Sequence, residues 1–384
     1  MKILGIETSC DETAAAVVED GVWILSNVVV SQIDIFAEYG GVIPEVAARN
    51  HLEVMMPVVK KALSDAECTW DDIDAIAVTH APGLLGSLLI GTLTARTLAI
   101  LHNKPLYAVH HLKSHVYANW LELQTMGPAA ISRSWPRPSG PSSRADGANS
   151  RAAALRNATS PGYWRHPSSP SFPLIALVVS GGHTQILYMP AHNQFEIIGT
   201  TRDDAVGECF DKVAKILGLP YPGGPTIAKA ALDGDEDKYK LPHPKVEGLD
   251  FSFSGLKTAV LRAVQKELGL PISHPSYDLK NHLSEEQVAD FAASFQKTAV
   301  EILCEKLALA MEQYPDVQSV VIAGGVSANK ALREALPEAY FPEPSLSGDN
   351  GAMVAAAAYY EIISGVKPVD PYSLNIYPRI SIEK

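Results

Sequence analysis

Two histidines four residues apart, His111 and His115, are the residues of this sequence whose type and spacing are best suited to chemistry. On a helix this spacing places both imidazoles on one face, one turn apart. Two imidazoles on one face can hold a divalent metal ion from the same side. By itself the spacing is found more often in ordinary surface or core histidines, so its meaning depends on the rest of the chain.

A polar loop at residues 8–13 is the second candidate, because it brings Asp11 and Glu12 together with serine and threonine hydroxyls. A tight loop between strands can point backbone amides at a phosphate, and its carboxylates can hold a cation or polarise a nucleophile. The same residue types are common in ordinary turns, and taken alone the loop is best explained as a turn. The glycines of residues 82–87 also allow two interpretations. Their backbone amides could bind an anion at a helix N-terminus, or the glycines could allow a strand and a helix to pack closely.

Apolar periodicity predicts the elements that position these motifs. The second half of the chain repeats the order of the first, with strands followed by helices, and this predicts a duplicated α/β architecture with a cleft between its halves. The predicted strands lie at residues 1–30 (a three-stranded meander), 73–79, 106–109, 174–180, 184–189, 195–199 and 320–323. The predicted helices lie at residues 43–63 (apolar at Val46, Leu52, Val54 and Val58), within 82–102 after a glycine-rich turn, and at the histidine pair. Further helices are predicted after residues 203–212 and ending at Gly218, from 251–257 onward, at 285–313 and from Asn329, with a loop at 221–225.

The composition is that of an ordinary soluble globular protein, with 384 residues, 47% hydrophobic and 19% charged. The length allows two domains, each with its own core. The most apolar window, residues 82–102, is interrupted by glycines and by Arg96, so no membrane span is expected. Four scattered cysteines and a start without a signal peptide predict a cytoplasmic protein. A net charge of −12 argues against indiscriminate binding to nucleic acid.

Residues 124–171 differ in kind from the rest of the chain. They contain seven prolines, ten serines, six arginines and one acidic residue, with few aliphatic side chains. Such a segment cannot bury enough apolar surface to offset the entropy lost on ordering, so we predict a disordered insertion with a net charge of about +5. The arginines leave two interpretations open, an RNA-contacting arm or a passive solvated insertion, and the second is favoured.

Six stretches with distinctive residues follow one another along the chain. They are GIETSCDET, GGVIPEVAARNH, the histidine helix HLKSHVYAN, VVSGGHTQ, GECFDKVAKILGLPYPGGP, and DFSFSGLKT together with AGGVSAN. In these motifs and their order the chain resembles the TsaD family, the tRNA threonylcarbamoyladenosine transferases of the ASKHA (actin-like) superfamily. The resemblance covers nearly the whole chain outside residues 124–171, and the number of ordered motifs makes it specific.

The resemblance implies an α/β fold of two duplicated actin-like, ribonuclease H-like domains with an active-site cleft between them. Residues 1–123, completed by residues 352–384, would form the N-terminal domain, and residues 172–351 the C-terminal domain. The implied reaction transfers a threonylcarbamoyl group from threonylcarbamoyl-AMP to N6 of adenosine 37, just 3′ of the anticodon, and releases AMP. The implied acceptors are tRNAs that read codons beginning with A.

By the same resemblance, His111, His115 and Asp349 would hold one divalent metal ion, iron(II) first and zinc as the alternative. Three protein ligands leave coordination positions open, as a metal that meets substrate requires. Asp11 or Glu12 is our candidate for accepting the proton of the attacking amine, on the basis of its place in the first loop. The positions expected to bind the nucleotide and sugar of the donor are Val178, Val179, Ser180, Gly181, Gly182, Asp211, Gly224 and Asn329. The expected partners are tRNA, threonylcarbamoyl-AMP, a TsaB-like paralogue and a TsaE-like ATPase.

The chain departs from the usual family pattern beside the proposed ligands. Lys113 stands where the family often has glutamate, Ser347 and Gly348 stand where cysteine and threonine are usual, and Ala81 replaces a glycine. Lys113 places a positive charge beside the proposed cation, which would weaken metal binding unless the side chain points away.

Three other functions fit parts of the sequence. A metallopeptidase of the helical zincin type needs glutamate directly after the first histidine, where this chain has Leu112. A small-molecule kinase or carbamoyltransferase of the same superfold is argued against by the histidine pair. A non-catalytic, nucleotide-binding scaffold subunit of the same complex is expected to lack the metal ligands, and this chain has all three.

Overall fold

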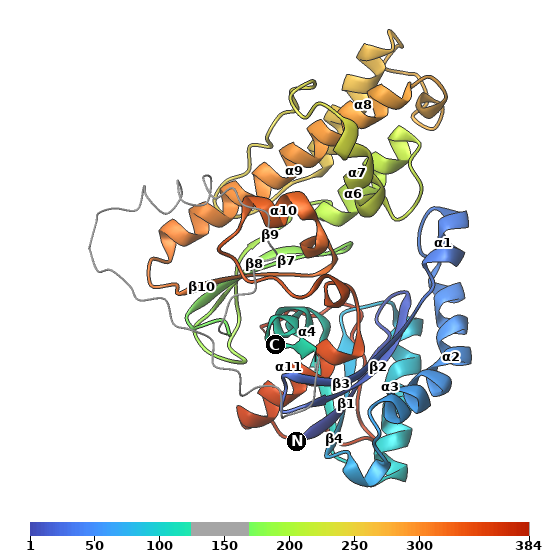
Figure 1. The fold of residues 1–384 in the computed structure, drawn as a ribbon, viewed down its shortest axis with the longest axis vertical. Coiled ribbons are helices and arrows are strands. Elements are labelled where there is room, and N and C mark those ends of the chain that lie inside the picture. The colour runs from blue at the N-terminus through green and yellow to red at the C-terminus, as the bar shows by residue number, and fades with distance from the viewer. Residues whose placement is uncertain (124–168, 384) are drawn as a thin grey trace, which may run out of the picture.

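Two mixed β-sheets organise the structure, a computed structural model that describes residues 1–123 and 169–383 (Figure 1). Sheet A has the strand order β5-β4-β1-β2-β3-β6, and sheet B has the order β10-β7-β8-β9. The strands of sheet A are β1 (Lys2–Glu7), β2 (Glu12–Glu19), β3 (Trp23–Ser31), β4 (Ala75–Ala81), β5 (Leu106–His110) and β6 (Glu122–Leu123). The strands of sheet B are β7 (Leu174–Val179), β8 (Thr184–Met189), β9 (Glu196–Thr200) and β10 (Ser319–Ala323).

The two sheets repeat one connection pattern. In sheet A, β1, β2 and β3 are antiparallel neighbours, and β4 and β5 then add in parallel on the side of β1. In sheet B, β7, β8 and β9 are antiparallel neighbours, and β10 adds in parallel to β7. An isolated parallel bridge between Val321 and Tyr340 takes the place beside β10 that β5 has beside β4. The predicted α/β class with a duplicated architecture is confirmed.

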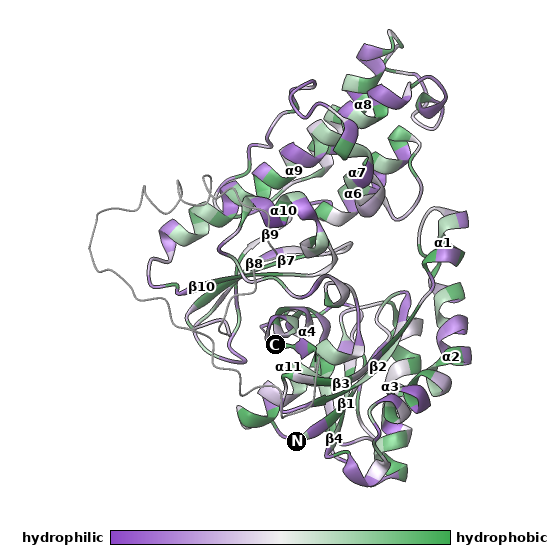
Figure 2. Ribbon diagram, viewed as in Figure 1, coloured by the Kyte–Doolittle hydropathy of each residue, from purple (hydrophilic) through white to green (hydrophobic). Residues whose placement is uncertain are grey.

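The helices form three layers, one between the sheets and one on each outer face (Figure 1). The apolar side chains of α2 and α3 pack on the outer face of sheet A. Those of α6 and α9 pack on the outer face of sheet B, and α8 packs against α6 and α9 farther from the strands (Figure 1). Figure 2 shows hydrophilic and hydrophobic residues alternating along α2 and α9, as expected for helices with one face toward solvent. The helices are α1 (Ile33–Tyr39), α2 (Pro44–Asp65), α3 (Leu85–Leu101), α4 (His111–Tyr117), α6 (Val206–Leu217), α7 (Gly223–Ala230), α8 (Ser254–Glu267), α9 (Glu285–Gln313), α10 (Lys330–Ala335) and α11 (Gly351–Ile363).

The central layer consists of α4 and α11, which share one apolar core with both sheets. This core joins Val18 of sheet A and Val178 of sheet B to Val116 of α4 and Val354 of α11, all four fully buried. Burial of this kind is the main stabilising contribution to folding. The core therefore fixes the N-termini of both central helices relative to the two sheets.

Glycine allows α11 to lie directly against the backbone of sheet A. A Cβ atom on Gly5 of β1 would lie 2.2 Å from the carbonyl oxygen of Gly351, the first residue of α11. A Cβ atom on Gly351 would lie 2.6 Å from the backbone nitrogen of Ala16 in β2. Since both contacts are with backbone, which cannot rotate away, this close approach requires glycine at both positions.

Most predicted elements are confirmed, and two details are wrong. Leu52 was expected on the apolar face of its helix, but it is 68% exposed, and the buried face of α2 includes His51 and Met55 instead. The predicted loop at 221–225 ends early, because α7 begins at Gly223. Pro225 fits there because the first turn of a helix does not use the missing proline N–H.

The predicted insertion and the predicted domain boundaries stay predictions. Residues 124–168 of the predicted disordered insertion lie outside the described residues. The domain boundaries stay a prediction, which the packing of α11 on β1 and β2 supports. Within residues 1–123 and 169–383, no helix combines the length and the apolar character needed to cross a membrane.

Replacing Gly5 by alanine tests the close approach of α11 to sheet A. We expect Gly5→Ala to lower the free energy of unfolding by about 3 kcal/mol or more, because the added methyl group meets backbone atoms. Urea unfolding measures the loss. Gly255→Ala in α8 is the matched control, since nothing lies within 4 Å of a Cβ built there. Equal stability of the two variants would contradict the argument.

Candidate active site

The residues predicted as metal ligands lie between the two sheets, at the N-termini of the two central helices (Figure 1). His111 is the first residue of α4 and directly follows β5, while Asp349 lies just before α11. The side chains of His110 and Asn350 cap these helices by accepting backbone N–H groups of their first turns. Strand β5 and the two caps thus position ligands that are far apart in the sequence.

The three candidate ligands form a compact buried cluster. The ligand atoms of His111, His115 and Asp349 all lie within 4.8 Å of one another. Nε2 of His115 lies 3.1 Å from Oδ1 of Asp349, and Nε2 of His111 lies 3.6 Å from the same oxygen. His115 is 1% exposed, and among the described residues neither of its ring nitrogens has a hydrogen-bond partner of suitable geometry. Such a buried nitrogen and this donor set fit a divalent metal ion.

Glu7 orients His111 from the side opposite Asp349. It is fully buried at the end of β1, and its Oε2 lies 3.3 Å from Nδ1 of His111. The hydroxyl of Thr79 donates to Oε2 at 2.5 Å, and the N–H of Ser9 donates to Oε1 at 2.5 Å. A carboxylate beside Nδ1 keeps the ring proton there and leaves Nε2 free to bind a metal.

The cluster is a buried group of opposite charges. Burial by itself would raise the pKa of Asp349, but the charges of His111 and His115 outweigh it and hold this pKa at about 2. Burial would lower the pKa of His111, but Asp349 and Glu7 outweigh it and raise this pKa to about 9. The two carboxylates therefore require positive charge nearby, which a protonated imidazole or a divalent cation with neutral imidazoles can supply.

Lys113 does not face the ligands. Its Nζ lies 5.3 Å from the ring centroid of Phe195, the geometry of a cation–π contact. Two residues from each histidine, it occupies the opposite face of α4. Burial lowers the pKa of Lys113, and the carboxylate of Glu361 opposes this shift. The lysine in place of the usual glutamate is thus compatible with the ligand cluster.

Residues of the second half of the chain complete the surroundings of the cluster. His183 lies in the turn between β7 and β8, and burial together with the charges of the two ligand histidines lowers its pKa to about 4. Tyr221 lies between α6 and α7, and its pKa is raised by burial and by the charges of Asp11 and Asp211. Tyr221 therefore lies close enough to Asp11 of the first loop and Asp211 of α6 to feel their charges.

The predicted donor-binding residues at the end of β7 fall into two groups. Val178 and Val179 are fully buried within the paired strand, so their side chains belong to the core. Ser180 begins the turn that follows, and Gly181 and Gly182 are exposed, with open space where a side chain would stand. A substrate would meet this turn rather than the valine side chains. Their role in binding stays a prediction.

The other predicted donor-binding residues have structural partners. Asp211 accepts the N–H of Gly223 at 2.7 Å and thereby caps α7 beside Gly224. Burial raises the pKa of Asp211, and this hydrogen bond partly offsets the effect. Asn329 caps α10, as predicted, and donates its amide to Gln296 at 2.8 Å. The binding roles of Asp211, Gly224 and Asn329 also stay predictions.

The first loop is held by a buried histidine of α2. Nε2 of His51 lies 2.9 Å from the carbonyl oxygen of Cys10, and its Nδ1 lies 2.7 Å from the hydroxyl of Thr13. Because a carbonyl oxygen only accepts, Nε2 carries the proton and Nδ1 accepts the threonine hydroxyl. Burial lowers the pKa of His51, which favours this neutral ring. His51 thus fixes both ends of the segment that carries Asp11 and Glu12.

Asp11 and Glu12, the candidate proton acceptors, lie in a confined acidic environment. Burial and then the charges of Asp349 and Asp11 raise the pKa of Glu12, and the hydroxyl of Ser31 donates to its carboxyl group at 3.0 Å. Asp11 is 8% exposed. Burial and the charge of Asp11 also raise the pKa of Cys10, so this thiol is not an activated nucleophile. The role of the two carboxylates stays a prediction.

The glycine-rich segment at residues 82–87 serves close packing. The N–H of Leu84 donates to the carbonyl of Ser9 at 2.8 Å, and the N–H of Gly83 donates to that of Pro378. A Cβ atom on Gly83 would lie 2.6 Å from the carbonyl oxygen of Ser9. These amides are therefore engaged within the protein, which favours the packing interpretation over an anion site.

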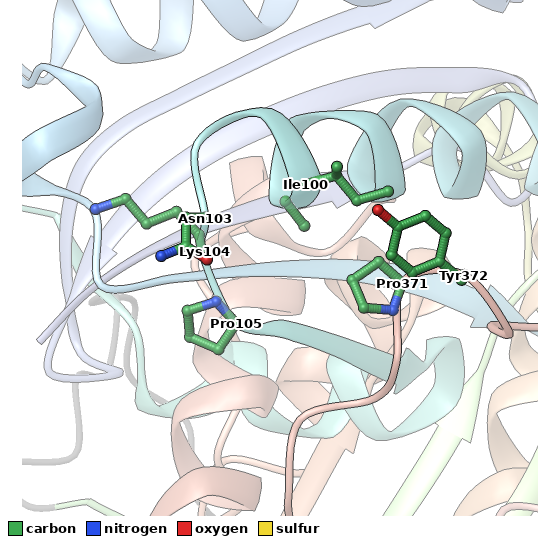
Figure 3. Close-up of a pocket in the computed structure, with 7 residues that line it drawn as sticks. Ile100, Asn103, Lys104, Pro105, Pro371 and Tyr372 are labelled. Carbon is green, nitrogen blue, oxygen red and sulfur yellow. The ribbon is translucent and has the colours of Figure 1, made fainter.

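A surface pocket at the end of α3 is separate from the cluster (Figure 3). It lies where the C-terminal segment passes the start of β5, and no residue of the histidine cluster or of the first loop lines it. The lining residues are Ala99, Ile100, Asn103, Lys104, Pro105, Pro371 and Tyr372. We therefore assign no part of the chemistry to this pocket.

Four residues of the site have no role that was predicted from the sequence: Glu7, His51, His183 and Tyr221. Each belongs to one of the motifs that carry the family resemblance, and this membership was the available signal. Glu7 and His51 contact His111 and the first loop, and His183 and Tyr221 lie near charged groups of the site that are distant in sequence. Only the three-dimensional structure could assign them.

The fold and the site define an α/β protein with a buried His–His–Asp cluster between two mixed sheets. The family model "TsaD: tRNA N6-adenosine threonylcarbamoyltransferase" matches residues 23–132 and 157–356. A tRNA N6-adenosine threonylcarbamoyltransferase of Symbiobacterium thermophilum is 44% identical over 389 residues, covering 99% of this chain and 96% of the relative. The enzyme of that name from Dehalococcoides mccartyi (strain CBDB1) is 43% identical over 388 residues, covering 100% and 99%.

One similar solved structure is the activator of the 2-hydroxyisocaproyl-CoA dehydratase from Clostridium difficile with bound ADPNP. The match covers 95% of this chain and 96% of the activator chain, with a TM-score of 0.47 and 12% sequence identity. The family itself rests on the sequence matches. The chain belongs to the TsaD family of tRNA N6-adenosine threonylcarbamoyltransferases. It is a transferase that forms N6-threonylcarbamoyladenosine (t6A) in tRNA, as the sequence predicted, and the metallopeptidase and kinase interpretations are set aside.

The orienting role of Glu7 predicts an effect on metal affinity. Glu7→Gln removes the charge beside Nδ1 of His111 while keeping the shape of the side chain. We expect it to weaken zinc binding at the cluster by about 10–100-fold, the usual effect of losing such an outer partner. Competition between the protein and a chromophoric chelator for zinc measures the change. Glu301→Gln, at an exposed carboxylate, is the control, and unchanged affinity in Glu7→Gln would exclude the orienting role.

The neutral ring of His51 predicts a pH-dependent contribution to stability. Because burial lowers the pKa of His51 in the folded state from its usual 6.5, protons bind preferentially to the unfolded chain below that pH. Stability present above pH 6.5 is therefore lost as the pH falls toward the folded-state pKa. We expect His51→Gln to be less stable than the wild type at about pH 7.5, with a smaller difference at about pH 5. Urea unfolding at both pH values checks this, and a constant difference would refute it.

Proposed function

We propose that the transfer takes place at the histidine cluster, with threonylcarbamoyl-AMP as donor and adenosine 37 of tRNAs reading A-starting codons as acceptor. The observation that carries the proposal is the joint burial of His111, His115 and Asp349 at the N-termini of the central helices. An exocyclic amine is a poor nucleophile, so the donor must be activated, and its mixed anhydride with AMP supplies a leaving group. The task left to the protein is to position the reactants and to stabilise developing charge.

We propose that the cluster holds iron(II), with zinc as the alternative. A metal ion bound there would act as a Lewis acid toward an oxygen of the donor. The chain's own contribution is to hold the ligands in place. Glu7 orients His111 through Nδ1, and the packed central helices fix His115 and Asp349.

The nucleotide of the donor would lie against the turn at residues 180–182 and the start of α7. The exposed backbone of this turn and the open space at Gly224 support its placement there. Asp11 or Glu12 would accept the proton that the attacking amine releases, since both belong to the loop that His51 fixes. We expect no covalent enzyme intermediate, in keeping with the raised pKa of the Cys10 thiol.

We propose a TsaB-like paralogue and a TsaE-like ATPase as partners, and the cytoplasm as the place of action. A candidate surface for the paralogue lies on the adjacent helices α2 and α3. Its exposed apolar side chains are Leu52, Met56, Leu85, Leu89 and Leu93. Apolar side chains one helical turn apart on two neighbouring helices suit packing against helices of another protein.

A single-turnover assay tests the role of the cluster. Labelled threonylcarbamoyl-AMP is mixed with unmodified tRNA and the protein with its partners, and label in the tRNA nucleoside is followed over time. We expect His111→Ala to slow transfer by at least about 100-fold, because losing even an outer partner of a metal ligand costs about 10–100-fold. Asp11→Asn and Glu12→Gln in the same assay identify which carboxylate accepts the proton.

The matched control for this assay is His243→Ala, which removes a partly exposed histidine between two carboxylates of α9. It should leave the transfer rate unchanged. A wild-type rate in His111→Ala, with its fold intact by circular dichroism, would contradict the proposed role of the cluster.

A further inference from the structure

A second group of metal-ligand side chains lies between α8 and α9, at one end of the long axis of the molecule (Figure 1). Its members are His274, Asp278 and His282, whose ligand atoms lie within 4.8 Å of one another. Nε2 of His274 lies 2.9 Å from Oδ2 of Asp278, and Nε2 of His282 lies 3.1 Å from the same oxygen. Adjacent ligands of a tetrahedral ion with bonds of about 2.1 Å lie about 3.4 Å apart, so the nitrogen–oxygen distances here are close to those of ligands that share one metal ion.

Buried residues hold this group in place from both sides. Gln265 of α8, only 2% exposed, donates its amide to two carbonyl oxygens of the loop, and that of His274 lies at 3.0 Å. Leu279, fully buried in the core of the second half, anchors the turn between Asp278 and His282. The ligand positions are thus fixed by packing before any ion binds, which lowers the ordering cost of binding.

The two oxygens of the Asp278 carboxylate have different partners. Asn281 donates to Oδ1 at 2.9 Å, which leaves Oδ2 facing the two imidazoles. The side chains of His274, Asp278 and His282 are 20%, 35% and 46% exposed, which gives an ion direct access and leaves room for water ligands.

We propose that His274, Asp278 and His282 form a second divalent metal site, of the zinc type, with water in the remaining coordination positions. Two imidazoles and one carboxylate suit zinc, nickel or copper and not magnesium or calcium, which prefer oxygen ligands. Each histidine would bind the ion through Nε2, with its ring proton on Nδ1. The bound ion would connect the segment that follows α8 to the segment that precedes α9. The site is independent of the active-site cluster.

Zinc titration of the chelator-treated full-length chain tests the second site. We expect the double variant His274→Ala/His282→Ala to bind one zinc ion fewer than the wild type, whatever the active-site cluster binds. Residual affinity at the altered site should fall by at least about 100-fold, since losing an outer partner alone costs about 10–100-fold. Zinc should also raise the melting temperature of the wild type more than that of the double variant.

The controls separate this site from other histidines. His243→Ala removes a single imidazole that lies between Glu301 and Glu305, and it should keep the wild-type stoichiometry. His111→Ala reports on the active-site cluster alone, so failure there is distinguishable from failure here. Should the double variant not fold, His282→Gln alone is read out by cobalt(II) absorption. Wild-type stoichiometry in the double variant, or an unaltered cobalt spectrum in His282→Gln, overturns the proposal.

Discussion

The burial of two carboxylates beside His111 is the constraint on which the histidine cluster depends. Glu7 is fully enclosed at the end of β1, and Asp349 meets both ligand histidines from the segment before α11. Removing such charges from water is costly unless positive charge and hydrogen bonds accompany them. The apolar packing that brings α4 and α11 between the sheets therefore also forces charges together, and the cluster must be neutralised for this packing to be stable.

The duplicated topology explains why the ligands meet where they do. His111 and His115 follow β5 in the first half, and Asp349 follows Tyr340, which bridges β10 in the equivalent place of the second half. In each half, the candidate metal ligands thus follow the last segment that pairs in parallel with the sheet. They lie near the carboxyl ends of the strands, which is where open α/β sheets bind small molecules. The spacing between the two halves sets the distance between the imidazoles and the carboxylate, so the packing of the central layer determines the geometry of the cluster.

The sequence predicted features that depend on local periodicity and failed where distant contacts decide. Strand alternation and helical spacing located most of the elements, although helices α1 and α11 were not predicted. The spacing of His111 and His115 is likewise a local helical property. Asp349 has no local signal and was reached only through the order of the family's motifs. Leu52 was misplaced because α2 has apolar residues on two faces, and only one of them meets sheet A. The start of α7 was missed because its cap, Asp211, comes from another helix.

The two histidine groups differ in a way that separates their roles. His111 and His115 are buried, so the charge of an ion there would be screened less by solvent and would act more strongly on a bound oxygen. Around His282 the side chains are partly exposed, and water would screen the same charge. An ion at the exposed site can hold two chain segments together, but its screened charge would polarise a substrate only weakly. This difference supports the proposed catalytic role of the buried cluster and the proposed structural role of the exposed group.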